Sequence, residues 1–221
     1  MDTPDEAHDY DAMDHADVNR VFVDDFLGSV TSSGLMEDRH GVGRPLEILD
    51  VGTGTAQIPI ELCRRFVPCN ITAIDLSEAM IEVATRNVDA SGLEGRIRIL
   101  HVDAKRLPYA DETFDAVISN SIVHHIPEPK SIFAESSRVL SPCGLLFLRD
   151  LLRPDNTNTL DHLVATYAGD TNERQSQMFR DSLHASLTIG EIQDILAAMG
   201  LPTTWARQTS DRHWTVVGER E

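Results

Sequence analysis

A short glycine-containing loop is the first segment of this chain whose residue types point to chemistry. It reads Asp50-Val51-Gly52-Thr53-Gly54-Thr55, and it lies between an apolar run and a segment with helical spacing. Glycines at such a turn let a ligand approach the backbone, and the N–H groups at the start of the next helix offer donors. In an open α/β sheet, ligands bind at the carboxyl ends of strands. The loop therefore predicts a binding site for a nucleotide-like ligand.

Three residues near this loop indicate which kind of ligand fits. A dinucleotide fingerprint needs a third Gly or Ala three positions after the second glycine, and Gln57 occupies that position. The carboxylate of Asp50 would repel a pyrophosphate, whereas it suits a cationic amino group. Asp75 ends the second predicted strand, where it can accept hydrogen bonds from both hydroxyls of a ribose. Because NAD-binding enzymes also have an acidic residue at the position of Asp75, only Gln57 and Asp50 argue against a dinucleotide and for a ligand with a cationic amino group.

Hydrophobic periodicity places the loop in a chain of alternating strands and helices. Strands are predicted at 46–51, 71–75, 97–102, 114–119 and 144–148, with two more near 203–208 and 213–218. Helices are predicted at 56–66, 77–91 and 128–140, and a capping-box pattern opens another at 188–199. Strands that alternate with helices of this length predict a parallel sheet covered on both faces.

The segments around this alternation are less regular. Residues 1–14 are polar and acidic, so we expect a flexible arm that carries Tyr10. Apolar residues at helical spacing predict a helix over residues 15–30, and residues 31–44 form a connector. Residues 155–187 are polar, and we expect them to be helical in parts and to cover a substrate.

Several segments together resemble the class I S-adenosylmethionine-dependent methyltransferases. The run from Leu49 to Thr55 looks like motif I of that family, and Ala73-Ile74-Asp75-Leu76-Ser77 with Met80 resembles the segment that follows it. Residues 101–104, 107–109 and 113–115 resemble the adenine-binding and fourth-strand region of that family. The resemblance covers about residues 46–150 and is nearest to small-molecule enzymes similar to the quinone-biosynthesis group. Pro142-Cys143-Gly144 stands where the family usually has Pro-Gly-Gly.

The alternation and the resemblance predict an α/β fold. We expect a Rossmann-like, doubly wound, mostly parallel seven-stranded sheet with an antiparallel last strand and an N-terminal helical cap. Residues 1–44 would form the arm and cap helix, and residues 45–221 the methyltransferase domain, with 155–187 as a substrate-cover insertion.

The resemblance also implies a role for each matching residue. Asp50, Gly52 and Gly54 would hold the methionine end of S-adenosylmethionine, with Thr53 and Gln57 in the same site. Asp75 would bind the ribose, and Leu76 and Met80 would lie against the adenine. Asp103 would accept from the adenine amino group, helped by the Ala104 backbone, and Asn120 and Ser121 would lie beside the sulfonium. Each of the three acids alone could be a helix cap or turn carboxylate, but three at successive strand ends favour a site.

Methyl transfer needs an aligned acceptor and exclusion of water, and a base only where the acceptor arrives protonated. The catalytic candidates follow the strand ends: Asn120, His124, His125, Arg149, His184 and His15. We expect one of the two adjacent histidines to face the substrate and the other to pack or cap a helix. Arg149 would either clamp a substrate carboxylate or form a salt bridge. No metal is expected, because adjacent histidines should point apart and no third ligand is evident.

Composition limits the partners of this chain. The formal net charge is −17, from 36 acidic and 19 basic residues, which disfavours nucleic acid and favours a small-molecule substrate. No stretch has the roughly 20 apolar residues of a membrane helix, and the acidic N-terminus matches no targeting signal, so we expect a cytoplasmic monomer or homodimer. Three cysteines without Cys-x-x-Cys indicate neither a disulfide framework nor a zinc site, and all three are expected to be packing residues.

Two alternative functions remain open at this point. The first is an NAD(P)-dependent oxidoreductase on a Rossmann fold, against which Gln57 and Asp50 argue. The second is a non-catalytic cofactor-binding protein that keeps the same loop without transferring a methyl group. Binding of S-adenosylhomocysteine against NADH would separate the first from a methyltransferase, and consumption of labelled cofactor would separate the second.

Overall fold

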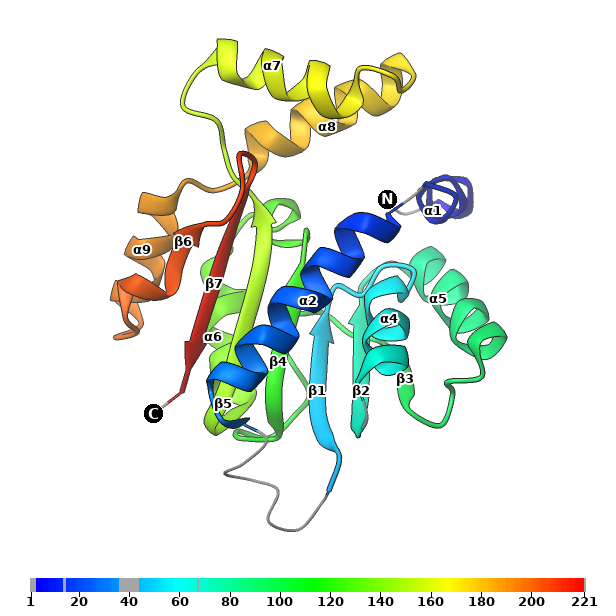
Figure 1. Ribbon diagram of the computed structural model, residues 1–221, viewed down its shortest axis with the longest axis vertical. Helices are drawn as coiled ribbons and strands as arrows, with labels where there is room; N and C mark the ends of the chain where they lie inside the picture. Colours follow the sequence, from blue (N-terminus) through cyan, green and yellow to red (C-terminus); the bar gives the residue numbers. More distant parts are fainter. Residues whose placement is uncertain (1–2, 14, 36–43, 67, 221) are drawn as a thin grey trace.

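A seven-stranded sheet forms the centre of the computed structural model, which describes residues 3–13, 15–35, 44–66 and 68–220 (Figure 1). Its strand order is β3-β2-β1-β4-β5-β7-β6, and β1 to β5 are parallel neighbours while β7 runs antiparallel to both β5 and β6. The strands are β1 (Leu46–Val51), β2 (Cys69–Asp75), β3 (Ile97–His101), β4 (Phe114–Asn120), β5 (Leu140–Leu151), β6 (Ala206–Gln208) and β7 (His213–Glu219). The order reverses between β1 and β4, which is where open α/β sheets bind ligands.

Helices cover both faces of the sheet and its carboxyl edge. The α-helices are α1 (Pro4–Asp11), α2 (Ala16–Ser32), α4 (Gln57–Arg65), α5 (Glu78–Ser91), α6 (Lys130–Val139), α7 (Thr157–Ala168), α8 (Glu173–Ala185) and α9 (Ile189–Ala198). Short 3₁₀ turns in the described part of the chain are η1 (Val123–His125) and η2 (Thr203–Trp205). Buried residues of α2, α4 and α5 form one core with the sheet, and those of α6 and α9 form another on the opposite face. These two layers make the fold the Rossmann-like α/β sheet expected from the sequence.

The strands form where the sequence offers short apolar runs that can be buried on both faces. In β4 every residue except Asn120 is buried, and in β1 only Glu47 is partly exposed. Helix α9 begins with the expected capping box, because Thr188 accepts from the N–H of Glu191 while the Glu191 carboxylate accepts from the N–H of Thr188. These local signals agree with the packing, which is why the element order matches the prediction.

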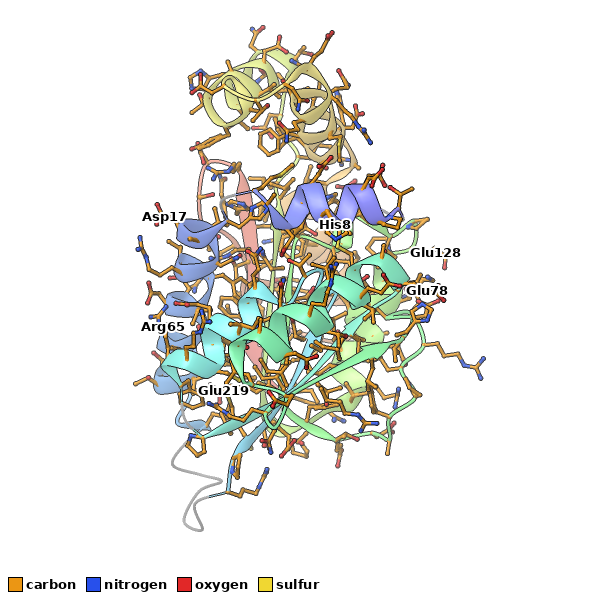
Figure 2. The ribbon with its side chains drawn as sticks, turned by 90° about the vertical axis from the view of Figure 1, so that its right-hand side faces the viewer. His8, Asp17, Arg65, Glu78, Glu128 and Glu219 are labelled. Carbon is orange, nitrogen blue, oxygen red and sulfur yellow. The ribbon has the colours of Figure 1, made fainter. Side chains whose placement is uncertain are left out.

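The N-terminal segment differs from the flexible arm that we expected. Residues 4–11 form α1, whose N-cap Thr3 accepts a hydrogen bond from the N–H of Glu6. Ala7 is fully buried against Met80 and Val83 of α5. Figure 2, in which His8 is labelled, shows α1 lying above α5 and below α7 and α8. Ala7 and Tyr10 thus pack one face of an otherwise mostly polar helix against α5. Most of the predicted connector over residues 31–44 lies outside the described residues.

Helices α7 and α8 stand apart from the two layers, over the carboxyl end of the sheet (Figure 1). They occupy the segment 155–187 that was expected to be helical in parts, and Leu160, Leu163 and Leu183 form a small core between them. No helix in the described part of the chain is both long and apolar enough to cross a membrane. Cys63 and Cys69 are buried as expected for packing residues, but Cys143 is exposed within β5, where its φ is 56°.

Candidate cofactor and active site

A cavity of about 400 Å³ opens at the carboxyl ends of β1, β2 and β4, beside the point where the strand order reverses. It lies where the glycine loop and the strand-end acids were expected to meet. Its described lining consists of Tyr10, Asn19, Asp50, Gly52, Thr53, Gly54, Thr55, Gln57, Ile58, Asp75, Leu76, Ser77, Met80, Asp103, Ala104, Lys105, Asn120, Ser121, Ile122, His125, Ile126 and Pro127. All of the residues predicted from the sequence to bind a cofactor are among them.

Two glycines let the loop after β1 turn tightly beneath the cavity. Gly52 has φ of +75°, and a Cβ built there would lie 2.2 Å from Cδ1 of Ile122, so no other residue fits without a shift. Gly54 has φ of +56°, and its N–H donates to Oδ2 of Asp75 at 2.9 Å. Ala56 then adopts the left-handed conformation and leads into α4. The backbone is thus exposed toward the cavity at the loop.

Asp50 supplies a buried carboxylate at the base of the cavity. Asp50 is only 2% exposed, and its Oδ2 has no hydrogen-bond partner within the described structure. Burial, with a smaller contribution from the negative charge of Asp75 and against a lowering effect of Thr53, raises the pKa of Asp50 to about 7. A buried acid without a full set of partners is costly, so this site favours a ligand that brings a cationic donor.

Asp75 ends β2 and joins the loop to the start of α5. One carboxylate oxygen accepts from the N–H of Gly54, and the other accepts from the N–H of Ser77 at 2.9 Å. Each oxygen keeps a second lone pair, so the group can still accept from a diol. Beside it, the Leu76 side chain is 56% exposed and Met80 is buried, which gives an apolar surface at the rim of the cavity.

Asp103 lies beyond the end of β3 and is half-exposed. Its Oδ1 accepts from the N–H of Lys105 at 2.9 Å, and the Lys105 ammonium lies at the same distance from it. The hydrogen bond to the Lys105 backbone, followed by that to the Lys105 side chain, holds the pKa of Asp103 below its usual value. Asp103 is therefore a charged acceptor at the outer end of the cavity.

The first two helices are attached to the glycine loop through one polar network. The amide of Gln57 donates to Oδ1 of Asp11 at 3.1 Å and accepts from the amide of Asn19 at 3.0 Å. Asn87 of α5 donates both to Oδ1 of Asp11 and to the carbonyl of Thr55. Gln57, which the sequence predicted as a cofactor-site residue in the place of a third glycine, therefore also connects α1 and α2 to the site.

Tyr10 of α1 covers the glycine loop from above. A Cβ added at Gly54 would lie 3.9 Å from Cε1 of Tyr10, and burial, with the charge of Asp75, raises the pKa of the Tyr10 phenol. The ring of His15 lies against it, with centroids 4.6 Å apart. Of these two N-terminal candidates, Tyr10 lines the cavity, whereas His15 is absent from its described lining and supports the Tyr10 ring.

The end of β4 and the turn η1 form the other wall of the cavity. Asn120 and Ser121 both line it, and Ser121 has φ of 59°, a conformation that costs energy in a residue other than glycine. His125 follows and is exposed at the cavity, whereas the His124 side chain is only 5% exposed. His125 therefore lies at the open space and His124 is packed, while the expectation that one of them faces a substrate stays a prediction.

The buried histidine is fixed by the end of β5. Nδ1 of His124 lies 2.7 Å from Oδ1 of Asp150, and the N–H of His124 donates to Oδ2 of the same carboxylate. The expectation that His124 and His125 point apart is wrong, because the 3₁₀ turn brings their ring centroids to 4.0 Å. Even so, the described residues contain no group of three His, Cys, Asp or Glu side chains that could hold a metal ion.

The remaining catalytic candidates lie away from the described lining. Arg149 is buried on the α2 face of the sheet, where it donates to Thr215 and forms an ion pair of 2.5 Å with Asp25. Of the two roles expected for it, the structure therefore has the salt bridge. His184 is exposed on α8, which packs against η1, and it does not line the cavity.

Sequence reasoning missed several residues that line the cavity, namely Asn19, Ile58, Lys105, Ile122, Ile126 and Pro127. The helical pattern of α2 marked its apolar face, whereas Asn19 lies on the polar face that turns toward Gln57. Gly52 was the one signal for Ile122, because a glycine in a tight loop can indicate that a neighbouring side chain occupies the space of its missing Cβ. Nothing in the order of residues indicated that the turn after β4 would fold back over the loop.

Comparisons with known proteins agree with this geometry. A family described as "Methyltransferase domain" matches residues 49–148. A demethylmenaquinone methyltransferase of Porphyromonas gingivalis is 34% identical over 50% of this chain and 45% of its own length. A malonyl-[acyl-carrier protein] O-methyltransferase of Geobacter sulfurreducens is 30% identical over 88% of this chain and 66% of its own. This chain spans about half the length of the first curated relatives that it matches.

Solved structures show the same fold. A SAM-dependent methyltransferase from Aquifex aeolicus superposes with a TM-score of 0.68 at 19% identity, over 99% of both chains. A protein from Methanococcus maripaludis, described as an S-adenosyl-L-methionine-dependent methyltransferase, superposes with a TM-score of 0.66 at 18% identity, over 100% of this chain and 95% of its own. The likeness extends over the whole length of this chain, including the helices that precede and follow the matched family segment.

Proposed function

We propose that this chain, which belongs to the class I S-adenosylmethionine-dependent methyltransferases, transfers the methyl group of that cofactor to a small-molecule acceptor. The observation that carries the proposal is the carboxylate of Asp50. It lies buried beneath a two-glycine loop with one oxygen unpartnered in the described structure, and its pKa is raised to about 7. An anionic dinucleotide would add a second negative charge there, whereas the cationic amino group of a methionine moiety would supply the missing donor.

The residues around the cavity fit the other parts of this cofactor. Asp75 keeps lone pairs for the two ribose hydroxyls, and the exposed Leu76 with the buried Met80 offers apolar surface for an adenine ring. Asp103 and the backbone at Ala104 can meet the adenine edge. Tyr10 would close the loop side, held there through Asp11 and Gln57. When bound, the cofactor supplies a methyl group on a sulfonium, which is an activated leaving group.

The chain's own residues then have three tasks at the acceptor end. Asn120 and Ser121 would orient the reacting groups, since they line the cavity at the end of β4. Ile122, Ile126 and Tyr10 would exclude water from it. We assign the role of proton acceptor to His125, because it alone among the six catalytic candidates is a histidine lining the cavity. His124, fixed by Asp150, would position it.

The same proposal includes the class of the methyl acceptor but not its identity. The relatives' names mention demethylmenaquinone, malonyl-[acyl-carrier protein] and a sterol, which differ in size and in the atom that is methylated. We propose a small molecule, admitted beneath α7 and α8, which would act as the cover expected for residues 155–187. The division into residues 1–44 and 45–221, the cytoplasmic location and the monomer or homodimer remain predictions.

Two measurements test the proposed function. Isothermal titration calorimetry should show that S-adenosylhomocysteine binds with at least about tenfold higher affinity than NADH, and the opposite order would contradict the cofactor assignment. Incubation with methyl-labelled cofactor and a panel of phenols, hydroquinones, carboxylic acids and amines should label at least one acceptor. His125→Asn should lower that transfer by about 10²–10⁴-fold while leaving S-adenosylhomocysteine binding unchanged. Tight binding without any transfer would favour the non-catalytic alternative.

A further inference from the structure

A pair of buried thiols lies between α4 and β2, away from the cavity. Sγ of Cys63 and Sγ of Cys69 are 3.9 Å apart, and each residue is 1% exposed. Cys63 comes from the last turns of α4, and Cys69 is the first residue of β2. A disulfide would require the two sulfur atoms to approach to about 2.05 Å. The two sulfur atoms would therefore have to come closer by about 2 Å.

The guanidinium of Arg96 is fixed directly beside this pair. Its Nε and Nη1 donate to the carbonyls of Cys69 and Cys63, and Nη2 donates to the carbonyl of Phe66. Nη2 also lies 3.1 Å from Sγ of Cys69. Its charge meets no carboxylate in any hydrogen bond found among the described residues. The polarisable sulfur of Cys69 is therefore the group best placed to become its counter-ion.

The surroundings divide the two thiols into different roles. A hydrogen bond from Cys63, followed by the charge and hydrogen bond of Arg96, lowers the pKa of Cys69 in spite of burial. The same contact and burial raise the pKa of Cys63. A thiolate is the nucleophilic form of cysteine, and a neighbouring thiol is the usual partner that resolves its oxidation.

We propose that Cys63 and Cys69 form a peroxide-reactive pair that closes to a disulfide in the folded protein. The Cys69 thiolate attacks one oxygen of hydrogen peroxide, so that an S–O bond forms, the O–O bond breaks and the released hydroxide takes up a proton. Cys63 then attacks the Cys69 sulfur, which forms the S–S bond, breaks the S–O bond and releases a second hydroxide that takes the Cys63 proton. Two thiols lose two electrons, and one peroxide becomes two waters.

The alternative is that Arg96 merely caps the carbonyls at the end of α4 and that both cysteines are packing residues. Cys143 separates the two explanations, because it is an exposed thiol in the same chain. An unactivated thiol is only a few per cent ionised near pH 7. A packing pair should therefore react more slowly than Cys143, and an activated pair should react faster despite its burial.

The experiment treats the folded full-length protein with hydrogen peroxide at pH 7 and maps all three cysteines by mass spectrometry under non-reducing conditions. We expect a Cys63–Cys69 disulfide to appear before Cys143 is modified. Cys63→Ser should leave a sulfenic acid on Cys69 that dimedone traps. Arg96→Gln should slow oxidation, whereas Arg98→Gln, at an exposed arginine close by in the chain, should not.

Two results would overturn the proposal. One is oxidation of Cys143 while Cys63 and Cys69 remain thiols. The other is disulfide formation at a rate that rises in proportion to the unfolded fraction in low concentrations of urea, because the reaction would then occur in unfolded chains. Both results come from the wild-type protein, so the test holds even where a cysteine variant fails to fold. The cofactor site is not involved, so failure of the proposed function would leave this result intact.

Discussion

Replacing Asp50 with asparagine should stabilise the cofactor-free protein and weaken its binding of S-adenosylhomocysteine. The carboxylate is buried and its pKa is raised from 3.8 to about 7, which corresponds to roughly 4 kcal/mol of destabilisation when the group is ionised in the folded state. The substitution would remove that charge but leave an amide in a site with few partners, which costs about 1–3 kcal/mol. We therefore expect Asp50→Asn to increase the free energy of unfolding by about 1–3 kcal/mol at pH 8.

The sign of this effect depends on pH. Because the folded-state pKa of Asp50 lies above the unfolded value, the folded protein binds its proton more tightly, and stability falls as pH rises from about 4 to 7. The advantage of the variant should therefore be greatest above pH 7 and should shrink as the pH falls below it. Urea denaturation of the cofactor-free protein between pH 5 and 8 measures this difference.

For binding of S-adenosylhomocysteine, the wild type should be favoured over Asp50→Asn. Loss of one member of a buried charge pair costs about 2–5 kcal/mol, so the variant should bind S-adenosylhomocysteine about 30-fold to several thousand-fold more weakly. In the wild type, affinity should fall about tenfold between pH 8 and pH 6, because a carboxylate with a pKa of about 7 is mostly protonated at pH 6. The variant should lose this dependence.

Isothermal titration calorimetry at several pH values gives both affinities. Asp89→Asn, an exposed change on α5 that removes the same charge, should leave binding and stability unchanged. The reasoning would be refuted by an Asp50→Asn protein that is less stable than the wild type at pH 8 yet binds the ligand equally well. That combination would mean that the carboxylate serves the fold and not the cofactor.

Three further outcomes are expected. Gly52→Ala should lower the free energy of unfolding by about 1–3 kcal/mol and abolish ligand binding, because its Cβ would overlap Ile122. Gly92→Ala, at a glycine with a similar φ but open space around it, should retain binding. Urea denaturation and calorimetry compare the stability and affinity of the two variants. Tyr10→Ala should weaken S-adenosylhomocysteine binding about tenfold by exposing the glycine loop, and unchanged affinity would show that α1 does not close over the ligand. Burial lowers the pKa of His213 to about 4, so the wild type should lose up to roughly 3 kcal/mol of stability as pH falls from 6.5 to 4, and His213→Gln should lose less in the same denaturation series.

The order of strands and helices was predictable because burial on both faces leaves a strong pattern in the sequence. β1 and β4 are almost entirely buried, and short apolar stretches such as Ala116-Val117-Ile118, bounded by polar residues, are typical of strands covered on both faces. Helix α1 was missed because it is held by tertiary contacts that leave no periodic pattern, namely Ala7 and Tyr10 packed against α5 and Asp11 bonded to Gln57 and Asn87. Its start was nevertheless marked, since Thr3 is followed by a proline and then by Glu6 at the third helical position.

The cavity was predictable to the extent that it depends on strand ends. Asp50 and Asp75 lie at the carboxyl ends of β1 and β2, and Asp103 lies just beyond β3, so their proximity follows from the topology of the sheet. The position of Tyr10 does not follow from it, because α1 is attached to the loop by hydrogen bonds that Asp11 accepts from Gln57 of α4 and Asn87 of α5. Contacts of that kind join segments far apart in the chain and leave no periodic signal.

Arg149 and Asp150 show why a strand end alone cannot assign a role to a side chain. The two residues are adjacent at the end of β5, and successive side chains in a strand point to opposite faces. Arg149 therefore turns toward α2, where Phe22 and Asp25 hold its guanidinium, and Asp150 turns toward η1, where it fixes His124. Only one face of β5 supports the acceptor wall, and the choice depends on which helix covers which face. The alternation of side chains along β5 thus separates Arg149, which stabilises the fold, from Asp150, which fixes His124, once the helices that cover each face are known.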